Sequence, residues 1–388
     1  MKCTAAMVTG LSTSSEFHLA PMQCYTNQPL RKLYSFLSPT SIKWTEMEKV
    51  DDLLPNIDQA LRKRLDGEEH EHNLILQLGS NDEIKLGDCV RIASCLYPNL
   101  KEINLNCGCP AIDTGGAPSY GASLMKDASL TAKLVESMVS ASDIDISVKC
   151  RIGVFDTAED VVAMNSKQYE YLHNYISSIQ HSGAKHVILH ARSAILSLSP
   201  VKNRIVPQLD YEIVQQIAKD FDGKVKITLN GGINSLDELK AIQTNDNSNI
   251  SSYMSGRWCL RRPLDLAGIE RTLSYNGIVP DVKSAIEKYI DYALANQNRF
   301  TMSELCLPLY LVVSQLQQDY ENGVDDSLLS WRDIETLYDT IEDGLVMHLS
   351  TGKVKKSSSI NFKKLANSFG PLCGKKVVSK WKRNRSEL

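Results

Sequence analysis

Polar and charged side chains stand at the ends of apolar runs in this 388-residue chain. Lys149 lies at the end of an apolar run, where a lysine keeps its charge only beside an anion or a polar acceptor, or when its ammonium reaches water past a buried stem. His190 and Arg192 follow a second run, and their spacing of two puts both on one face of a strand, although a histidine there can also be satisfied within a core. We expect these side chains to face a polar opening.

Two glycine-containing segments indicate a phosphate site. Residues 230–233 read Asn-Gly-Gly-Ile, and residues 255–257 read Ser-Gly-Arg. A Gly-Gly pair by itself is usually a tight turn. Backbone N–H groups of glycines beside a cation nevertheless bind phosphate in two particular loops of (β/α)8 barrels. The two segments together therefore predict a bound phosphate if the chain forms such a barrel.

Eight short runs rich in β-branched residues, each followed by a helical stretch, predict a parallel α/β fold that closes into a (β/α)8 TIM barrel. We expect strands at 17–21, 42–45, 74–78, 102–106, 146–150, 186–190, 226–230 and 252–255, and the clearest helices at 82–96, 128–140, 167–181, 210–219 and 235–243. Active sites of such barrels lie at the carboxyl ends of the strands. The residues found there are Met22, Gln23, Gln77, Asn104, Asn106, Lys149, His190, Arg192, Asn230, Gly231, Gly232, Gly256 and Arg257.

Beyond residue 275 the strand pattern stops, and Ile286, Tyr289, Ile290 and Ala293 recur at helical spacing. Residues 351–388 hold eleven Lys and Arg and one acid, so this tail carries +10 and the remainder −13. A basic tail attracts polyanions but can equally be a solvated extension without a partner. We expect an N-terminal extension at 1–16, the barrel at 17–275, a smaller helical domain at 276–350 and the basic C-terminal tail at 351–388.

The composition, with 43% hydrophobic and 23% charged residues, is that of a soluble globular enzyme. No apolar run approaches the roughly 20 residues that cross a bilayer, so we expect no membrane segment. The ten cysteines lack the Cys-x-x-Cys spacing of zinc sites, which predicts reduced thiols and no metal. We expect a cytoplasmic monomer, although the Ser- and Ala-rich start leaves organellar targeting open.

Ten short motifs follow one another along the predicted barrel. They include Leu-Ala-Pro-Met (19–22), Leu-Gln-Leu-Gly (76–79), Glu-Ile-Asn-Leu-Asn-Cys-Gly-Cys-Pro (102–110), Gly-Ala-Ser-Leu-Met (121–125) and Val-Lys-Cys-Arg-Ile-Gly (148–153). His-Ala-Arg (190–192), Asn-Arg (203–204), Asn-Gly-Gly-Ile (230–233) and Gly-Arg (256–257) complete the pattern with Trp-Thr-Glu-Met (44–47). In this order the chain resembles the tRNA-dihydrouridine synthases, in particular the bacterial A-type and its plant and algal relatives.

The resemblance implies an FMN across the barrel mouth, NADPH as electron donor, and reduction of the uracil 5,6 double bond of a uridine in the tRNA D-loop. It implies that FMN is bound by Pro21, Met22, Gln23, Gln77, Lys149, His190, Asn230, Gly231, Gly232, Gly256 and Arg257. It also implies that the base and the RNA are contacted by Asn104, Asn106, Arg192, Lys202 and Arg204. A lysine at the flavin edge fits the negative charge that reduced flavin carries there.

The sequence departs from the family at the residue that supplies the proton. The family has a cysteine there in a Gly-Ala-Cys-Leu-Met context, and this chain has Ser123. Because a serine hydroxyl is a far weaker acid than a thiol, three explanations stay open. Another group, with Tyr120, Cys107 and Cys109 nearest in sequence, donates the proton; Ser123 or a water does so slowly; or the chain is a catalytically impaired member that binds flavin or tRNA.

Two readings compete with a tRNA-uridine reductase. A catalytically silent RNA-binding protein would keep the barrel as a scaffold, which Ser123 favours and the flavin ligands do not. A barrel flavoenzyme acting on a small molecule would share the phosphate site but would not need the Arg192 and Arg204 pair. The basic tail, with Phe362, Phe369 and Trp381 interleaved, could add salt-dependent affinity and base stacking to RNA binding.

Overall fold

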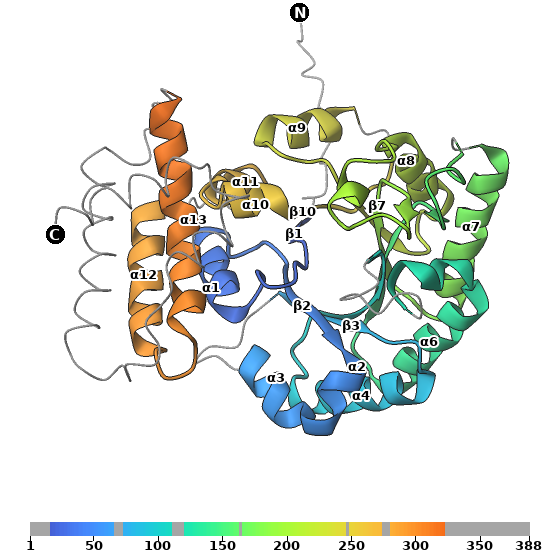
Figure 1. Cartoon of the computed structure of the whole chain (residues 1–388), viewed down its shortest axis with the longest axis horizontal. Coiled ribbons are helices and arrows are strands. Elements are labelled where there is room, and N and C mark those ends of the chain that lie inside the picture. Colours follow the sequence, from blue (N-terminus) through green and yellow to red (C-terminus); the bar gives the residue numbers. More distant parts are fainter. Residues whose placement is uncertain are drawn as a thin grey trace, which may run out of the picture.

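The computed structural model describes residues 16–65, 73–110, 120–162, 165–245, 248–273 and 280–322. Eight parallel strands lie in the order β1-β10-β9-β7-β5-β4-β3-β2. The two ends of this order meet, because the Leu19 N–H donates to the Ile42 carbonyl at 2.8 Å and His18 pairs with Ile42. The predicted (β/α)8 TIM barrel is confirmed (Figure 1). The strands are β1 (Glu16–Leu19), β2 (Lys43–Lys49), β3 (Leu74–Gly79), β4 (Glu102–Cys107), β5 (Ile146–Arg151), β7 (His186–His190), β9 (Lys226–Asn230) and β10 (Ser252–Ser255).

Helices surround the barrel, and the predicted ones are found within one residue of their expected ends. The helix that begins after Ser235 has a capped start: the Ser235 hydroxyl accepts from the Glu238 N–H at 3.1 Å, and the Glu238 carboxylate accepts from the Asn234 N–H at 2.7 Å. The helices are α1 (Gln28–Leu37), α2 (Val50–Leu53), α3 (Ile57–Leu65), α4 (Glu83–Leu96), α6 (Ala128–Ala141), α7 (Ser166–His181), α8 (Tyr211–Asp220), α9 (Leu236–Thr244), α10 (Arg257–Arg261) and α11 (Asp265–Leu273), with short 3-10 turns η1 (Leu54–Asn56), η2 (Gly121–Lys126) and η3 (Lys202–Arg204).

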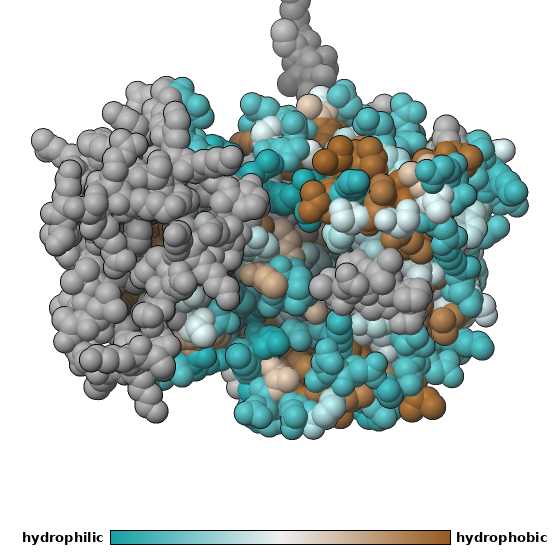
Figure 2. Space-filling view, in the orientation of Figure 1, coloured by the Kyte–Doolittle hydropathy of each residue, from teal (hydrophilic) through white to brown (hydrophobic). Residues whose placement is uncertain are grey.

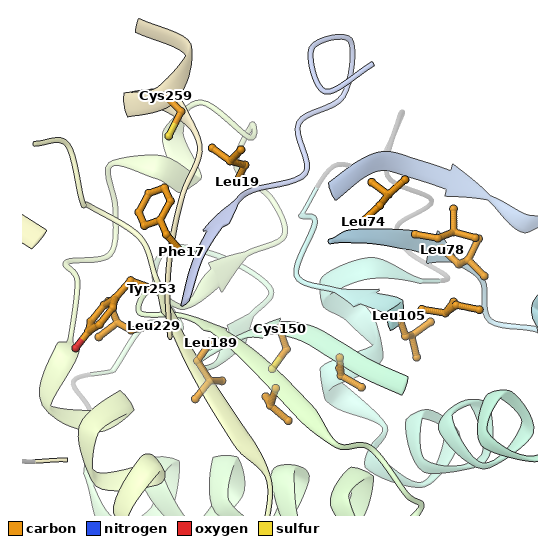
Figure 3. Close-up of a cluster of buried hydrophobic side chains, with 14 of the residues drawn as sticks. Phe17, Leu19, Leu74, Leu78, Leu105, Cys150, Leu189, Leu229, Tyr253 and Cys259 are labelled. Atoms are coloured by element: carbon orange, nitrogen blue, oxygen red, sulfur yellow. The ribbon is translucent and has the colours of Figure 1, made fainter. Parts of the chain in front are cut away.

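Alternate side chains of each strand point outward and join the helices in one continuous core. Figure 3 shows part of this layer, with Leu105, Cys150 and Leu189 on neighbouring strands. Burial of this outward face provides the main hydrophobic stabilisation, at about 25 cal/mol per Å² of apolar surface removed from water.

The inward-facing side chains are of two kinds. One part of the interior is apolar and contains Ala20, Ile42, Trp44, Ile75, Ile188 and Met254. The other part is polar and buried, although the strands read as apolar runs: it contains Asn104, Ser147, His186 and Thr228. Buried polar groups require hydrogen-bond partners, and these side chains find them in one another. One side of the barrel interior, below the carboxyl ends of the strands, is therefore polar.

Two further helices, α12 (Val282–Ala295) and α13 (Met302–Glu321), pack against α1 at one side of the barrel (Figure 1). Ile286 and Tyr289 are buried as the helical spacing predicts, and the Tyr289 hydroxyl donates to the Leu305 carbonyl at 2.8 Å. Arg262 joins α13 to the barrel, because its guanidinium binds Asp319 at 2.6 Å.

Two short strands, β6 (Val154–Phe155) and β8 (Ala194–Ile195), pair above the barrel in the segments that follow β5 and β7. No sequence pattern predicted them. Figure 2 shows brown apolar patches among hydrophilic residues on the barrel face, and the exposed large apolar side chains include Val201, Ile205 and Val206 after β8.

Residues 1–15 of the expected N-terminal extension, residues 323–350 of the expected helical domain and the basic tail at 351–388 lie outside the described residues. The domain boundaries proposed for these parts stay predictions. Within the described ranges, no helix has the length and apolar character that crossing a membrane requires.

Candidate active site

A cavity of about 430 Å³ opens at the carboxyl ends of the strands. It brings together residues from β1, β3, β4, β5, β7, β9 and β10 and their loops, which are distant in the sequence. Most of the predicted site residues line it, namely Pro21, Met22, Gln23, Gln77, Asn106, Lys149, His190, Arg204, Asn230, Gly231, Gly232, Gly256 and Arg257.

Lys149 is held at the cavity by a neighbouring strand. Its ammonium donates to Asn230 Oδ1 at 3.0 Å, and Asn230 Nδ2 donates in turn to the Met254 carbonyl at 2.9 Å. Burial lowers the pKa of Lys149 to about 8, and the nearby Arg151 acts in the same direction. Within the described residues no carboxylate is paired with this ammonium. The amine is thus poised to gain from an anionic ligand.

His190 lies against the glycines that follow β9. Burial lowers the pKa of His190 well below its ordinary value, and the neighbouring cations Arg151 and Lys149 lower it further, so the ring is neutral near pH 7. Gly231 has a φ of +111°, and a Cβ there would lie 2.5 Å from His190 Cδ2. Only glycine fits a positive φ with this close approach. The Gly231 backbone and the His190 ring therefore share one wall of the cavity.

Arg151 also lines the cavity, although we did not predict it as a site residue. Its Nε donates to the Gly108 carbonyl at 2.9 Å, and its Nη1 donates to the carbonyl of Ser193 at 3.2 Å. Burial lowers the pKa of Arg151 to about 10. Its position two residues after Lys149 on the same strand was the signal that could have identified it.

The predicted RNA-contacting residues separate in the structure. Arg204 lines the cavity, whereas Lys202 is exposed on the same turn and does not. Arg192 is buried and donates from Nη1 to the carbonyls of Ile205, at 2.6 Å, and of Pro207, so it anchors this loop. Asn104 is fully buried below the cavity. Direct contact of Arg192, Lys202 or Asn104 with substrate stays a prediction.

The groups considered as proton donors are also separated. Ser123 lies in η2, outside the cavity lining, and its hydroxyl donates to the Tyr120 carbonyl at 3.0 Å. Cys107 points outward into the core, and burial raises its pKa to about 12. Cys109 lines the cavity. Burial raises the pKa of Tyr120, whose ring lies against Gly79. Residues 111–119 lie outside the described ranges.

Known proteins match this chain over the part that forms the barrel and the cavity. A family model described as dihydrouridine synthase (Dus) matches residues 18–303. The tRNA-dihydrouridine(20/20a) synthase of Escherichia coli (strain K12) is 34% identical over 267 residues, which cover 68% of this chain and 71% of that protein. The protein of the same name from Pasteurella multocida is 33% identical over 280 residues, covering 71% of this chain and 79% of that protein. The matched residues include all eight barrel strands except Glu16 and Phe17, and all the residues that line the cavity.

Proposed function

This chain belongs to the dihydrouridine synthase family, and on that premise we propose that it reduces uridine to 5,6-dihydrouridine in the D-loop of tRNA with FMN and NADPH. The observation that carries the proposal is the cavity at the barrel mouth, where a neutral histidine and a glycine pair meet a lysine that has no carboxylate partner among the described residues. These groups suit a flat ligand that carries carbonyl acceptors at one end and a phosphate at the other.

The residues present fit FMN. The cavity volume of about 430 Å³ is typical of cofactor sites. A Cβ at Gly232 would lie 2.3 Å from Leu209 Cδ1, so only glycine fits there. The glycine pair and Arg257 line the same cavity, where glycine N–H groups and the guanidinium would bind the phosphate. Lys149 and His190 lie next to this glycine pair, and together with Gln77 they would bind the polar edge of the ring system and the ribityl chain. Pro21, Met22 and Gln23 would lie along the ring system.

When bound, the flavin would supply the hydride that reduces C6 of uracil. The protein must then supply a proton to C5 and must keep the extruded base in place. Asn106 and Arg204 both line the cavity, where Asn106 would bind the base and Arg204 would bind the RNA. Lys202 is exposed beside Arg204 and adds positive charge. Among the candidate acids, Cys109 is the thiol that lines the cavity, and a thiol is a far stronger acid than a serine hydroxyl.

A second candidate function is binding of flavin or tRNA without completed reduction. It is favoured by Ser123, whose hydroxyl is engaged with the Tyr120 carbonyl.

A monomeric state and a cytoplasmic location stay predictions.

The test is an assay for dihydrouridine at positions 20 and 20a, the positions in the relatives' names, in tRNA from cells that lack this modification. The chain, FMN and NADPH are supplied together. Formation of dihydrouridine by the native chain, and its loss in Lys149→Met, supports the reductase. Flavin binding without product supports the impaired member, and absence of both contradicts the proposed function.

A further inference from the structure

A chain of hydrogen bonds runs from the cavity down the polar side of the barrel interior. Asn106 Nδ2 donates to Gln77 Oε1 at 3.0 Å, and Gln77 Nε2 donates to Asn104 Oδ1 at 2.9 Å. Asn104 Nδ2 donates to Ser147 Oγ at 2.9 Å. The Ser147 hydroxyl is in turn hydrogen-bonded to the carboxylate of Glu102, at the opposite end of β4 from the cavity.

The two ends of a side-chain amide have the same shape, and only its partners determine which end faces which neighbour. A carboxylate can only accept, so the Ser147 hydroxyl must donate to Glu102, and its oxygen is left to accept from Asn104. Asn104 must then present Oδ1 to Gln77, and Gln77 must present Oε1 to Asn106. The orientation of each group thus determines which end of the next amide, its oxygen or its NH2 group, faces that group.

The upper end of the chain agrees with this direction. Asn106 Oδ1 accepts from the backbone N–H groups of Gly108 and Cys109, both at 3.1 Å. Backbone N–H groups cannot reverse their role. At the lower end, His186 Nδ1 lies 3.0 Å from a Glu102 oxygen, and His186 Nε2 lies 2.6 Å from Thr228 Oγ1.

Glu102 is ionised at neutral pH despite its burial. Burial by itself would raise the pKa of this carboxyl, but His186 and the hydrogen bonds from His186 and Ser147 outweigh that effect and leave the pKa below its ordinary value. The carboxylate therefore keeps its role as acceptor across the neutral range.

We infer that Glu102 is a positioning residue: acting through Ser147 and Asn104, it fixes the Gln77 amide from below. The Asn106 amide is fixed from above by the backbone N–H groups of Gly108 and Cys109, and the two ends of the chain of hydrogen bonds agree at Gln77. In this orientation each amide uses one N–H within the chain and keeps a second N–H for a ligand. The site is thereby set to bind a ring edge that carries carbonyl oxygens or ring-nitrogen acceptors. The inference rests on the proposed function for the identity of that ring, which would be flavin or uracil, but not for the orientation itself.

A double-mutant cycle on the ligand-free chain tests the orientation without flavin or tRNA. In Gln77→Glu, a carboxylate oxygen faces Asn104 Oδ1, and Asn104 cannot turn while Ser147 donates to Glu102. We expect this variant to lower the Tm by roughly 3 °C or more. The double variant combines Gln77→Glu with Glu102→Gln, and there every bond below position 77 can reverse. The amide at position 102 can donate to the Ser147 oxygen, and the Ser147 hydroxyl can then donate to Oδ1 of a turned Asn104. Asn104 Nδ2 can in turn donate to the carboxylate at position 77. The double variant should therefore melt above Gln77→Glu, although it carries one more substitution.

Repulsion between two carboxylates could give a similar rescue, and Ser147→Ala separates the two causes. Repulsion does not need the Ser147 hydroxyl. The chain of hydrogen bonds from Glu102 through Ser147, Asn104 and Gln77 to Asn106, called the relay below, does need it. In a Ser147→Ala background, Asn104 is free to turn, so Gln77→Glu should lose most of its penalty and Glu102→Gln should rescue little. Additive effects in the first cycle, or an unchanged rescue in the Ser147→Ala background, would overturn the inference.

Flavin affinity gives the functional consequence. Glu102→Gln and Ser147→Ala should weaken FMN binding to the apoprotein about threefold to tenfold, as measured by quenching of flavin fluorescence. Ser252→Ala is the matched control, because this buried hydroxyl bonds Thr228 on the far side of His186 and lies outside the relay. It should melt lower but bind FMN normally, and equal weakening in Ser252→Ala would contradict a role specific to the relay. Absence of FMN binding by the native chain would count against the proposed function alone, since the stability cycle still decides the orientation.

Discussion

The ends of β5, β7 and β9 and the segment after β4 border the same cavity, but they differ in what holds them. Lys149 and Asn230 are fixed to each other and to β10 by hydrogen bonds within the sheet. The segment after β4 is held by bonds to its own neighbours: the Cys109 N–H donates to Asn106 Oδ1 at 3.1 Å, and the Ala122 N–H of η2 donates to the Cys109 carbonyl at 2.8 Å. The Ser123 hydroxyl bonds the Tyr120 carbonyl at the start of the same turn. The difference teaches that the groups expected to bind a cofactor are built into strands, whereas the group expected to give a proton depends on a loop.

The largest expected effect concerns the strand side. Lys149→Met removes the cation at the cavity and its bond to Asn230. We expect FMN affinity to fall roughly 10- to 100-fold, since a hydrogen bond to a charged group contributes about 1.5–3 kcal/mol. Fluorescence titration of the apoprotein measures this. An affinity within twofold of the native value would show that the comparison assigns the cofactor to the wrong side.

The next effect concerns the glycine wall. Gly231→Ala places a Cβ 2.5 Å from His190 Cδ2 at a φ of +111°. We expect FMN affinity to fall about tenfold and the free energy of unfolding to fall by about 1–3 kcal/mol. Gly223→Ala is the control, because its φ is also positive, at +69°, while nothing lies within 4 Å of its Cβ. Gly223→Ala should lose stability from backbone strain but keep its FMN affinity. Equal losses of FMN affinity in the two variants would contradict a role for the contact between Gly231 and His190.

The loop side is tested by moving a thiol. Ser123→Cys restores the family's residue, and Cys109→Ser removes the thiol that lines the cavity. If Cys109 donates the proton, Cys109→Ser should slow dihydrouridine formation about tenfold or more while FMN affinity stays unchanged. If Ser123→Cys forms dihydrouridine faster than the native chain and Cys109→Ser forms it at the native rate, the proton donor lies in η2 instead. Single-turnover rates with tRNA distinguish these results.

The smallest expected effect is a pH dependence. Lys149 has a pKa of about 8 in the free protein, so its charge is present below that pH and is lost as the pH rises through it. A bound acceptor or anion favours the charged form and raises this pKa. We therefore expect FMN affinity to fall by at most about tenfold between pH 7 and pH 9. Lys149→Met should flatten this profile, and a native profile that is already flat would contradict the role of the charge.

The sequence predicted the eight strands because each pairs an apolar, β-branched run with a helix, and it predicted the cavity residues because parallel strands end at one face. It could not separate Arg192 from Arg204, since only the folded loop shows that Arg192 binds the carbonyls of Ile205 and Pro207. It also missed the direction of the hydrogen bonds from Glu102 to Asn106, because this direction depends on partners from different strands. Local patterns predict elements, but partners across the sheet are fixed by tertiary structure.

The central claim is that the barrel mouth binds a flavin that passes electrons from NADPH to tRNA uridine. The most direct measurement is the visible absorption spectrum of the chain reconstituted with FMN, recorded without oxygen during addition of NADPH and then of unmodified tRNA. The account predicts that the flavin band bleaches with NADPH and returns with tRNA as dihydrouridine forms. A protein that acquires no flavin band would contradict the cofactor site, and a bleached band that unmodified tRNA does not restore would contradict uridine reduction.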